Sequence, residues 1–181
     1  MTVYETDRLI VREWTRQPGD LARVFDMYSR WEVARWLGAQ PRAMGDPAEA
    51  ATAVDRWRGQ YADSGGRYGC WAIEVRDTGT VAGSILLKPL PNSDGSPPTD
   101  IEVGWHLHPD SWGRGYATEA ARGAIEREFD AGTKEIFAVV NPDNGPSLAV
   151  CRRLGMTPLG LTDRWYGLTV EAFRVEHGMS A

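Results

Sequence analysis

A short segment with two glycines, residues 112–117, has the residue types and the spacing of an anion-binding loop. It lies between a predicted strand and a predicted helix, and Gly113 and Gly115 allow positive φ angles and a close approach of the backbone to a ligand. The free N–H groups of the first helical turn and the helix dipole favour a negatively charged group in front of them. We therefore expect a phosphate group at this loop, although two glycines before a helix also occur in ordinary tight turns. The segment reads Trp112-Gly113-Arg114-Gly115-Tyr116-Ala117.

Two side chains that can transfer protons, Glu102 and His106, precede this loop on the predicted strand 101–108. Alternation places them on one face, with Gly104 between them and His108 at the end. A carboxylate in a central strand is costly unless its face borders a cleft, so Glu102 is a candidate base; the alternative is a solvated carboxylate at a strand end. His106 has a reference pKa of ~6.5, which also suits proton transfer, whereas a core histidine with one hydrogen bond is the alternative.

Composition and charge exclude several classes of function. The formal net charge is -5 and the sequence contains no run of basic residues, which argues against a nucleic-acid-binding surface. Cys70 and Cys151 form no C-x-x-C motif and have no neighbouring histidine, so we expect neither a metal site nor a disulfide framework. The first seven residues show neither a basic n-region nor an apolar h-region, and the sequence contains no apolar run of about 20 residues. We therefore expect a cytoplasmic protein with reduced thiols and no membrane partner.

The elements that must position these residues follow from apolar periodicity and from turn signals. With 181 residues, 42% of them apolar, the chain is long enough to bury the core of one domain. We expect an α/β fold: a mixed, mostly antiparallel sheet of six to seven strands, helices on both faces, and one parallel strand–helix–strand unit over residues 101–140. The predicted strands are residues 8–14, 68–75, 81–87, 101–108, 136–140, 158–163 and 170–176, and the predicted helices are residues 18–29, 31–37, 46–62, 117–129 and 144–154.

Four segments of the chain resemble one known family, in the same order and at the family's spacing. Residues 112–120 are similar to the cofactor motif of the GNAT superfamily of acetyltransferases, in the form found in the RimJ/RimL-type branch. Trp112 stands where the general motif has Gln or Arg, and Gly115 and Ala117 fill its last two positions. The other three segments that resemble this branch are residues 5–12, residues 32–38, and the Asn-x-x-Ser helix 144–154 with its closing turn.

The resemblance implies acetyl-CoA as the acyl donor and a single acetyltransferase domain over residues 1–181. The backbone N–H groups of residues 114–118 would hold the pyrophosphate, and the main chain around Leu107 would pair with the pantetheine arm as if it were an added strand. Asn144 and Ser147 would border the pantetheine and the thioester; a plain helix N-cap is the alternative role for Asn144, and the two roles can coexist. The cofactor-binding residues expected on this basis are Leu107, Trp112, Gly113, Arg114, Gly115, Tyr116, Ala117, Thr118, Asn144 and Ser147.

The chemistry implied is the attack of an amine on a thioester, which needs a proton acceptor and a hydrogen-bond donor for the oxyanion. The branch often has Glu at the position of Glu102, which makes Glu102 the first candidate base and His106 the second. Many members of the family use a Tyr as the acid four residues before the closing Gly, but this position is Cys151. Ser147 is the candidate donor in its place, because a buried Cys usually behaves as a small hydrophobic residue.

The acceptor implied by the resemblance is a primary amine, either the N-terminal α-amine of a protein or a small molecule. Trp31, Trp36 and Trp165 lie in the segments that border the acceptor cleft in this family, so we expect them to bind the substrate. An acyl-CoA sensor without turnover is a second interpretation. A nucleotide-binding α/β protein is a third, and it is disfavoured because Thr118 stands where the third Gly of G-x-G-x-x-G belongs. The oligomeric state stays open, with a homodimer as one option.

Overall fold

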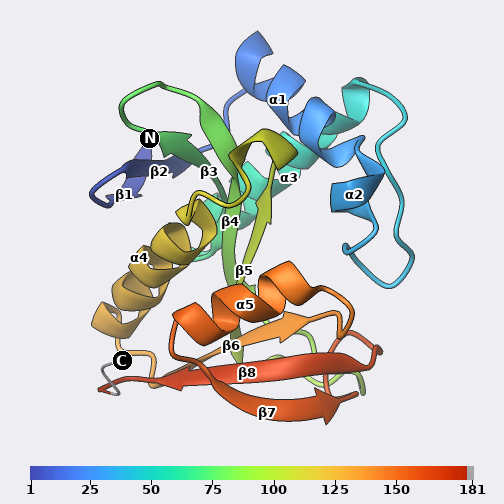
Figure 1. Ribbon diagram of the computed structural model, residues 1–181, viewed down its shortest axis with the longest axis vertical. Helices are drawn as coiled ribbons and strands as arrows, with labels where there is room; N and C mark the ends of the chain where they lie inside the picture. Colours follow the sequence, from blue (N-terminus) through green and yellow to red (C-terminus); the bar gives the residue numbers. More distant parts are fainter. Residues whose placement is uncertain (179–181) are drawn as a thin grey trace.

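The chain folds around one eight-stranded sheet whose spatial order is β1-β2-β3-β4-β5-β6-β8-β7 (Figure 1). The structure, a computed structural model, describes residues 1–178. Every pair of neighbouring strands is antiparallel except β5 and β6, which are parallel. The strands are β1 (Thr2–Glu5), β2 (Leu9–Glu13), β3 (Gly69–Val75), β4 (Val81–Pro89), β5 (Ile101–Leu107), β6 (Glu135–Val140), β7 (Thr157–Thr162) and β8 (Val170–Glu176).

Helices cover both faces of this sheet (Figure 1). On one face, α1 and α3 pack against β3, where Val24 and Val54 share a buried cluster with Ala72. On the other face, α4 lies over the centre of the sheet and α5 lies over β6, so that Val150 of α5 shares a second cluster with Ala138. The helices are α1 (Pro18–Tyr28), α2 (Trp31–Ala34), α3 (Ala48–Asp63), α4 (Tyr116–Asp130) and α5 (Gly145–Arg153).

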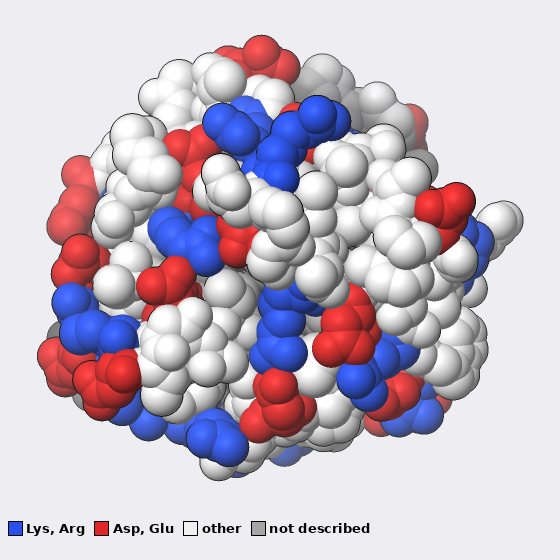
Figure 2. Space-filling model, turned by 90° about the horizontal axis from the view of Figure 1, so that it is seen from above, with Lys and Arg blue, Asp and Glu red and all other residues white. Residues whose placement is uncertain are grey.

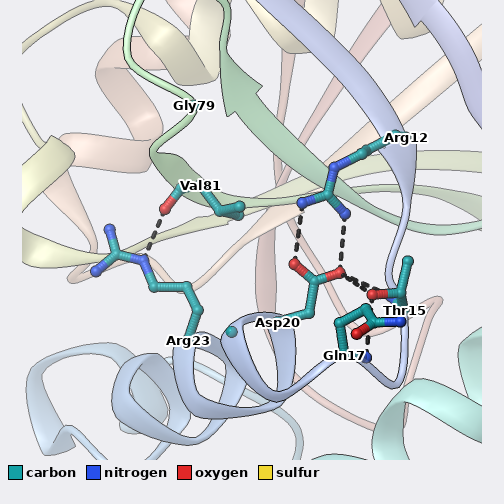
Figure 3. A pocket seen from close by; sticks show the side chains of 8 residues that line it. Arg12, Thr15, Gln17, Asp20, Arg23, Gly79 and Val81 are labelled. Carbon is teal, nitrogen blue, oxygen red and sulfur yellow. Dashed lines mark hydrogen bonds and ion pairs between the residues drawn. The ribbon is translucent and has the colours of Figure 1, made fainter.

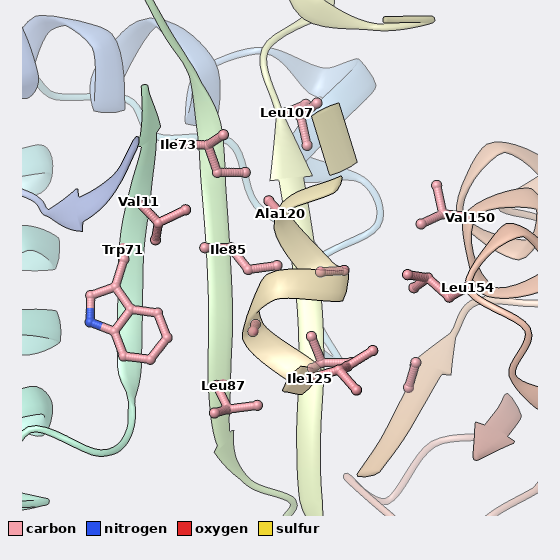
Figure 4. Packing of buried hydrophobic residues seen from close by; sticks show 14 of the residues in the cluster. Val11, Trp71, Ile73, Ile85, Leu87, Leu107, Ala120, Ile125, Val150 and Leu154 are labelled. Carbon is pink, nitrogen blue, oxygen red and sulfur yellow. The ribbon is translucent and has the colours of Figure 1, made fainter. Parts of the chain in front are cut away.

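Small side chains on α4 let this helix lie close to the strands beneath it. Ala120, Ala121 and Ala124 are fully buried, and their spacing of three to four residues places them on one stripe of the helix. They belong to the same cluster as Ile73 of β3 and Ile85 of β4, whose side chains point toward the helix (Figure 4). This packing fixes the N-terminus of α4 beyond the C-terminal end of β5.

The main features of the predicted fold are confirmed, and two details differ. The mixed, mostly antiparallel sheet, the helices on both faces and the parallel unit formed by β5, α4 and β6 are all present. The structure has eight strands, whereas six to seven were expected. The unexpected strand is β1, which the residue pattern of its own segment did not predict. Local pairing with β2 and a hydrogen bond from Tyr4 Oη to the carbonyl oxygen of Ala120, at 2.6 Å, hold it in place. The predicted helix 31–37 ends at Ala34 and continues only as a turn, in which the N–H of Leu37 bonds to the Ala34 carbonyl oxygen.

Strands β5 and β6 diverge after a single paired position. Glu102 and Phe137 are their register partners, whereas β6 follows β8 from Glu135 to Val140 and turns away from β5 (Figure 1). The main-chain groups of β5 beyond Val103, over residues 104–107, therefore have no strand partner on that side. We refer to these unpaired edges of β5 and β6 as the split.

A buried carboxylate fixes the C-terminal end of α4. Glu128 is fully buried and accepts hydrogen bonds from Arg67 Nη2 at 2.7 Å and from Thr133 Oγ1 at 2.5 Å. The side chain of Arg67, in contrast, is 40% exposed, while that of Glu128 is 0% exposed. Loss of Arg67 would leave a buried charge without its partner, whereas loss of the Glu128 charge would leave a guanidinium that water can still solvate.

We expect Arg67→Met to lower the free energy of unfolding by about 3 kcal/mol, and Glu128→Gln to lower it by only ~1 kcal/mol, because only the first change leaves a buried unpaired charge. Equilibrium unfolding in urea, followed by circular dichroism, measures both. The double variant Arg67→Met/Glu128→Leu serves as the control and should recover part of the loss. A larger loss for Glu128→Gln than for Arg67→Met would contradict this asymmetry.

Candidate functional site

The loop between β5 and α4 contains a row of free backbone N–H groups. It follows the short turn η1 (Pro109–Ser111), and Gly113 and Gly115 adopt φ angles of 73° and 80° before α4 begins. Within the described residues 1–178, the N–H groups of residues 113–118 have no hydrogen-bond acceptor, and the first bonded N–H of the helix is that of Glu119, at 3.1 Å from the Gly115 carbonyl oxygen. Free N–H groups at the positive end of a helix dipole form an anion site.

A pair of charged side chains, Arg8 and Glu119, supports this loop from the turn between β1 and β2. Arg8 Nε lies 2.6 Å from Glu119 Oε2, and Arg8 Nη1 donates to the carbonyl oxygen of Arg114 at 3.1 Å. Glu119 Oε1 also accepts from Thr6 Oγ1 at 2.6 Å and from the Arg8 N–H at 2.9 Å. Partial burial raises the pKa of Glu119, but these hydrogen bonds outweigh it and hold the pKa below its ordinary value. The segment 5–12, which the family resemblance singled out, thus positions the loop.

The split exposes the main-chain edge of β5. The N–H of His108 bonds to Ala82 and that of Leu90 bonds to Asp100, so the even-numbered residues of β5 direct their main-chain groups toward β4 and the odd-numbered ones toward β6. The Leu107 carbonyl oxygen accepts a hydrogen bond from Trp112 Nε1 at 2.9 Å.

The groups that remain for a ligand on this edge are the N–H of Leu107 and both main-chain groups of Trp105. Because they follow one another along an extended strand, they can pair with a ligand that runs alongside β5. Such a ligand would have one end at the loop 113–118 and the other at Glu102, where the split begins.

Glu102 is nearly buried at the inner end of the split. Its side chain is 9% exposed, its Oε2 accepts a hydrogen bond from the hydroxyl of Tyr166, and Lys88 Nζ lies 3.9 Å from the same oxygen. Burial raises the pKa of Glu102 above its ordinary value, while Lys88 and the Tyr166 hydroxyl oppose this rise. A carboxylate whose pKa is raised toward neutrality is suited to accept a proton.

Sequence patterns did not indicate Lys88 or Tyr166 as residues of this site. Lys88 is the cross-strand partner of Glu102 in the β4–β5 register, a position that the exact pairing of the two strands would have revealed. Tyr166 lies in the connection between β7 and β8, 64 positions from Glu102 in the chain. The only local signal for it is the following Gly167, which marks a turn.

His106 is half-buried and lies away from the inner end of the split. Its Nδ1 lies 3.0 Å from the hydroxyl of Tyr28, which donates to Ser84 Oγ at 3.1 Å, and Trp14 Nε1 donates to the same oxygen at 3.2 Å. The loss of hydration, with a contribution from the positive charge of Lys88, lowers the pKa of His106 to about 4. The imidazole is therefore neutral at physiological pH.

The start of α5 has the capping geometry that the sequence predicted. The side-chain oxygen of Asn144 accepts a hydrogen bond from the N–H of Ser147 at 3.3 Å, so Asn144 is the N-cap of this helix. Contact of Asn144 and Ser147 with a cofactor stays a prediction. Cys151 is 0% exposed, and burial raises the pKa of its thiol to about 12, which agrees with a packing role.

The three tryptophans expected to bind substrate differ in their surroundings. Trp165 is 1% exposed, its Nε1 donates to Asp100 Oδ2 at 3.1 Å, and its ring packs against Phe137. Trp36 is half-buried beneath the guanidinium of Arg35, 4.3 Å from the ring centroid. Trp31 is 56% exposed. Trp165 is thus a core residue, and its neighbour Tyr166 is the one that reaches Glu102.

One surface hollow, of about 530 Å³, lies between α1 and the β3–β4 hairpin (Figure 3). Its charged side chains already have partners: Arg12 Nη1 lies 2.9 Å from Asp20 Oδ2, and Arg23 Nε donates to the carbonyl oxygen of Val81 at 2.7 Å. Because these charged groups already have partners, the hollow offers little for catalysis.

A second hollow, of about 780 Å³, borders the loop before α4. Arg8, Arg122 and Arg153 line it together with Gly115 and Thr118. The hydroxyl of Thr118 is buried and has no hydrogen-bond partner within residues 1–178, which supports a ligand at this end of α4. Acidic side chains, among them Glu119 and Glu126, also line this hollow, and Lys and Arg side chains are likewise interspersed with Asp and Glu side chains on the face shown in Figure 2.

Within residues 1–178, no helix combines the length and the apolar character needed to cross a membrane. Within the same residues, His, Cys, Asp and Glu side chains form no group of three or more that could hold a metal ion.

The chain is similar to known proteins over most of its length. Residues 8–157 match the model of the acetyltransferase (GNAT) domain. The chain is 30% identical over 160 residues to the uncharacterised N-acetyltransferase YoaA of Bacillus subtilis (strain 168), covering 88% of this chain and 85% of YoaA. The fold is similar to that of RimL, a ribosomal L7/L12 α-N-protein acetyltransferase solved with coenzyme A. The TM-score is 0.77 at 14% sequence identity, and the similarity covers 97% of this chain and 98% of RimL. It is also similar to a ribosomal-protein-S5-alanine acetyltransferase from Vibrio fischeri, with a TM-score of 0.70, 15% identity, and coverage of 97% of each chain.

We expect neither cysteine to react with iodoacetamide in the folded protein at pH 8. Cys70 and Cys151 are both buried, and burial raises the pKa of each thiol to about 12, so the reactive thiolate is scarce. Mass spectrometry should find no label on the native protein and two labels after denaturation in urea. Rapid native labelling of Cys151 alone would show an accessible thiol and restore it as a candidate acid.

Proposed function

Because the chain belongs to the acetyltransferase (GNAT) family, we propose that it transfers an acetyl group from acetyl-CoA to a primary amine. The observation that carries this proposal is the order of groups along the split. Free N–H groups of residues 113–118 lie at its outer end, an unpaired main-chain edge follows, and the buried carboxylate of Glu102 lies at its inner end. A long donor with an anionic end and a reactive end fits this order.

Each part of this donor has a matching group in the protein. The N–H groups of the loop suit a diphosphate, and the N–H of Leu107 with the main-chain groups of Trp105 suits the amides of an extended arm that adds to the sheet as a strand. Asn144 and Ser147 are proposed to border this arm, because they begin the helix that follows β6. When bound, acetyl-CoA supplies an activated acyl group at the inner end of the split.

Glu102 is proposed to accept the proton of the attacking amine. An α-amine has a reference pKa of ~8 and arrives partly protonated, so a proton acceptor is needed. His106 is less suitable, because it is four residues nearer the outer end, about 13 Å at ~3.3 Å per residue. The neighbouring Lys88 stabilises the ionised form of Glu102, which is the form that accepts a proton.

The acceptor is proposed to be the N-terminal α-amine of a protein, with small-molecule amines as the alternative class. The support is the fold likeness to RimL and to the ribosomal-protein-S5-alanine acetyltransferase, whose names state protein acceptors. Trp31, exposed at α2, and Trp36 are the proposed contacts for this substrate.

We expect Gly115→Val to weaken CoA binding at least about ten-fold, because a β-branched side chain disfavours the φ angle of 80° and its Cβ would lie 3.4 Å from Arg8 Nη2. Isothermal titration calorimetry with CoA measures the dissociation constant. Gly132→Val is the matched control: it has the same kind of strain, at a φ angle of 95°, but lies at the other end of α4. Unchanged CoA affinity in Gly115→Val would mean that the loop is only a turn.

We expect Glu102→Gln to lower kcat by roughly 10²–10⁴-fold with little change in CoA affinity, because the amide keeps the size of the side chain but cannot accept the proton. Release of CoA from acetyl-CoA, assayed with a panel of peptides with free N-termini, polyamines and amino sugars, measures turnover and identifies the acceptor class.

The pH dependence of the wild-type enzyme provides the check on this role. The base must be ionised, so kcat/KM should fall as the pH drops through a pKa that burial has raised above the ordinary value for Glu. Full activity in Glu102→Gln with the best amine of the panel would remove Glu102 from the mechanism. CoA binding without turnover on any amine would instead favour a sensor.

A further inference from the structure

We propose that Tyr166 is the second proton-transfer group of this site, and that it gives its phenolic proton to the departing CoA thiolate while Glu102 takes the proton of the amine. Because Tyr166 acts in the reaction proposed above, its role rests on that proposed function. The position that usually carries the acid in this family is Cys151, which is fully buried.

Two side chains from other parts of the chain, Lys88 and Tyr166, meet at Glu102. The hydroxyl of Tyr166 donates to Glu102 Oε2, and Lys88 Nζ lies 3.9 Å from the same oxygen and 5.1 Å from the centroid of the Tyr166 ring. The ammonium group therefore interacts with both the carboxylate and the face of the phenol ring. This arrangement orients the phenol oxygen at the inner end of the split.

The backbone of Tyr166 adopts a conformation that is strained for residues other than glycine. Its φ angle is 60°, and within residues 1–178 it is the only residue other than glycine with a positive φ. The N–H of Tyr166 bonds to the Pro91 carbonyl oxygen at 3.1 Å, and that of Gly167 bonds to Ser93 Oγ at 2.9 Å, so the loop after β4 holds the turn in place. A side chain retained where glycine would be unstrained indicates a role for that side chain.

Tyr166, the proposed acid, and Cys151 lie on opposite faces of β6. Cys151 packs with Ile136 and Ala138 on the face covered by α5. Tyr166, in contrast, packs near Phe137, which alternation directs to the other face. Ser147, the donor considered from the sequence, makes no hydrogen bond to Glu102 within the described residues; its N–H bonds to Asn144 instead.

The proton transfers balance over one reaction cycle. Starting from the free amine, the N–C bond forms, the C–S bond breaks, and the electron pair of the C–S bond leaves with sulfur. Glu102 accepts one proton from nitrogen and Tyr166 gives one proton to sulfur. The protonated Glu102 then returns its proton to the phenolate across their shared hydrogen bond, which restores both groups. Burial and the nearby Glu102 raise the pKa of Tyr166, so the phenol starts the cycle protonated.

We expect Tyr166→Phe to lower kcat about 10- to 100-fold, because a thiol with a reference pKa of ~8.5 needs only modest acid assistance. The dissociation constant of CoA should not change. The acceptor is the amine of the panel above that reacts fastest. The proton inventory, which is the dependence of kcat on the fraction of D₂O in the solvent, should be curved for the wild type because two protons are in transfer. For Tyr166→Phe it should be linear.

The pH profile gives a second readout. The groups that face Glu102 are Lys88 from β4 and Tyr166, while Asp100 on the same strand face is paired with Arg164 at 2.8 Å. Because the Tyr166 hydroxyl lowers the pKa of Glu102, its loss should move the acidic limb of kcat/KM to higher pH. A loss of structure alone would lower the plateau without moving the limb.

Two further variants serve as controls. Tyr68→Phe removes a phenol that lies 3.4 Å from the buried carboxylate of Glu128, away from the site, and should leave kcat, the proton inventory and the acidic limb unchanged. Tyr166→Gly relieves the positive φ angle but also removes the ring that packs near Phe137, and it should be as slow as Tyr166→Phe.

The outcomes separate the role of Tyr166 from the proposed function. Wild-type kcat, a curved inventory and an unmoved limb in Tyr166→Phe, under conditions where Glu102→Gln is inactive, would overturn the role of Tyr166 alone. Full activity in Glu102→Gln, or no binding of CoA, would overturn the proposed function itself. A slow Tyr166→Phe with a linear inventory and a shifted limb supports both.

Discussion

Strands β5 and β6 are parallel neighbours that pair at one position, Glu102 with Phe137, and the arrangement of the other elements depends on this divergence. Because β6 stays paired with β8 along its length, the sheet bends in its middle instead of ending there. β5 keeps β4 on one side, and on the other side its main-chain groups beyond Val103 face no strand. Backbone groups without partners are costly inside a protein unless water or a ligand satisfies them. The divergence therefore creates a binding edge in the centre of the fold.

The two ends of this edge have opposite chemistry, and remote parts of the chain support each of them. At the outer end, the loop before α4 has free N–H groups and is held by Arg8 from the first hairpin. At the inner end, Glu102 is held by Lys88 from the neighbouring strand and by Tyr166 from the last hairpin. The segments near the two ends of the chain thus support the same central strand. This arrangement explains why the sheet extends well beyond the strands that border the split.

Local signals were sufficient for the loop and its helix but not for the contacts around Glu102. The glycines at 113 and 115, the alanine stripe of α4 and the Asn144 cap are features of a few consecutive residues, and all of them predicted the observed local structure. The strand β1 and Tyr166 depend on contacts between distant segments, for which a single sequence has no pattern. Trp165 shows the limit: it is a core residue, and the side chain that reaches the Glu102 carboxylate is that of the next residue, Tyr166. The φ angle of 60° at Tyr166 is a feature of the folded turn that the residue pattern did not predict.

The unpaired edge of β5 also makes the stability of the protein depend on the cellular concentration of its ligand. A sheet that lacks one partner along part of a central strand is completed by whatever strand-like ligand lies there, and a ligand that binds only the folded state shifts the folding equilibrium. The fraction of molecules that open enough for proteases to cut would then rise when the cellular pool of such a ligand falls. The lifetime of the protein in the cell would thus report on the supply of its own substrate.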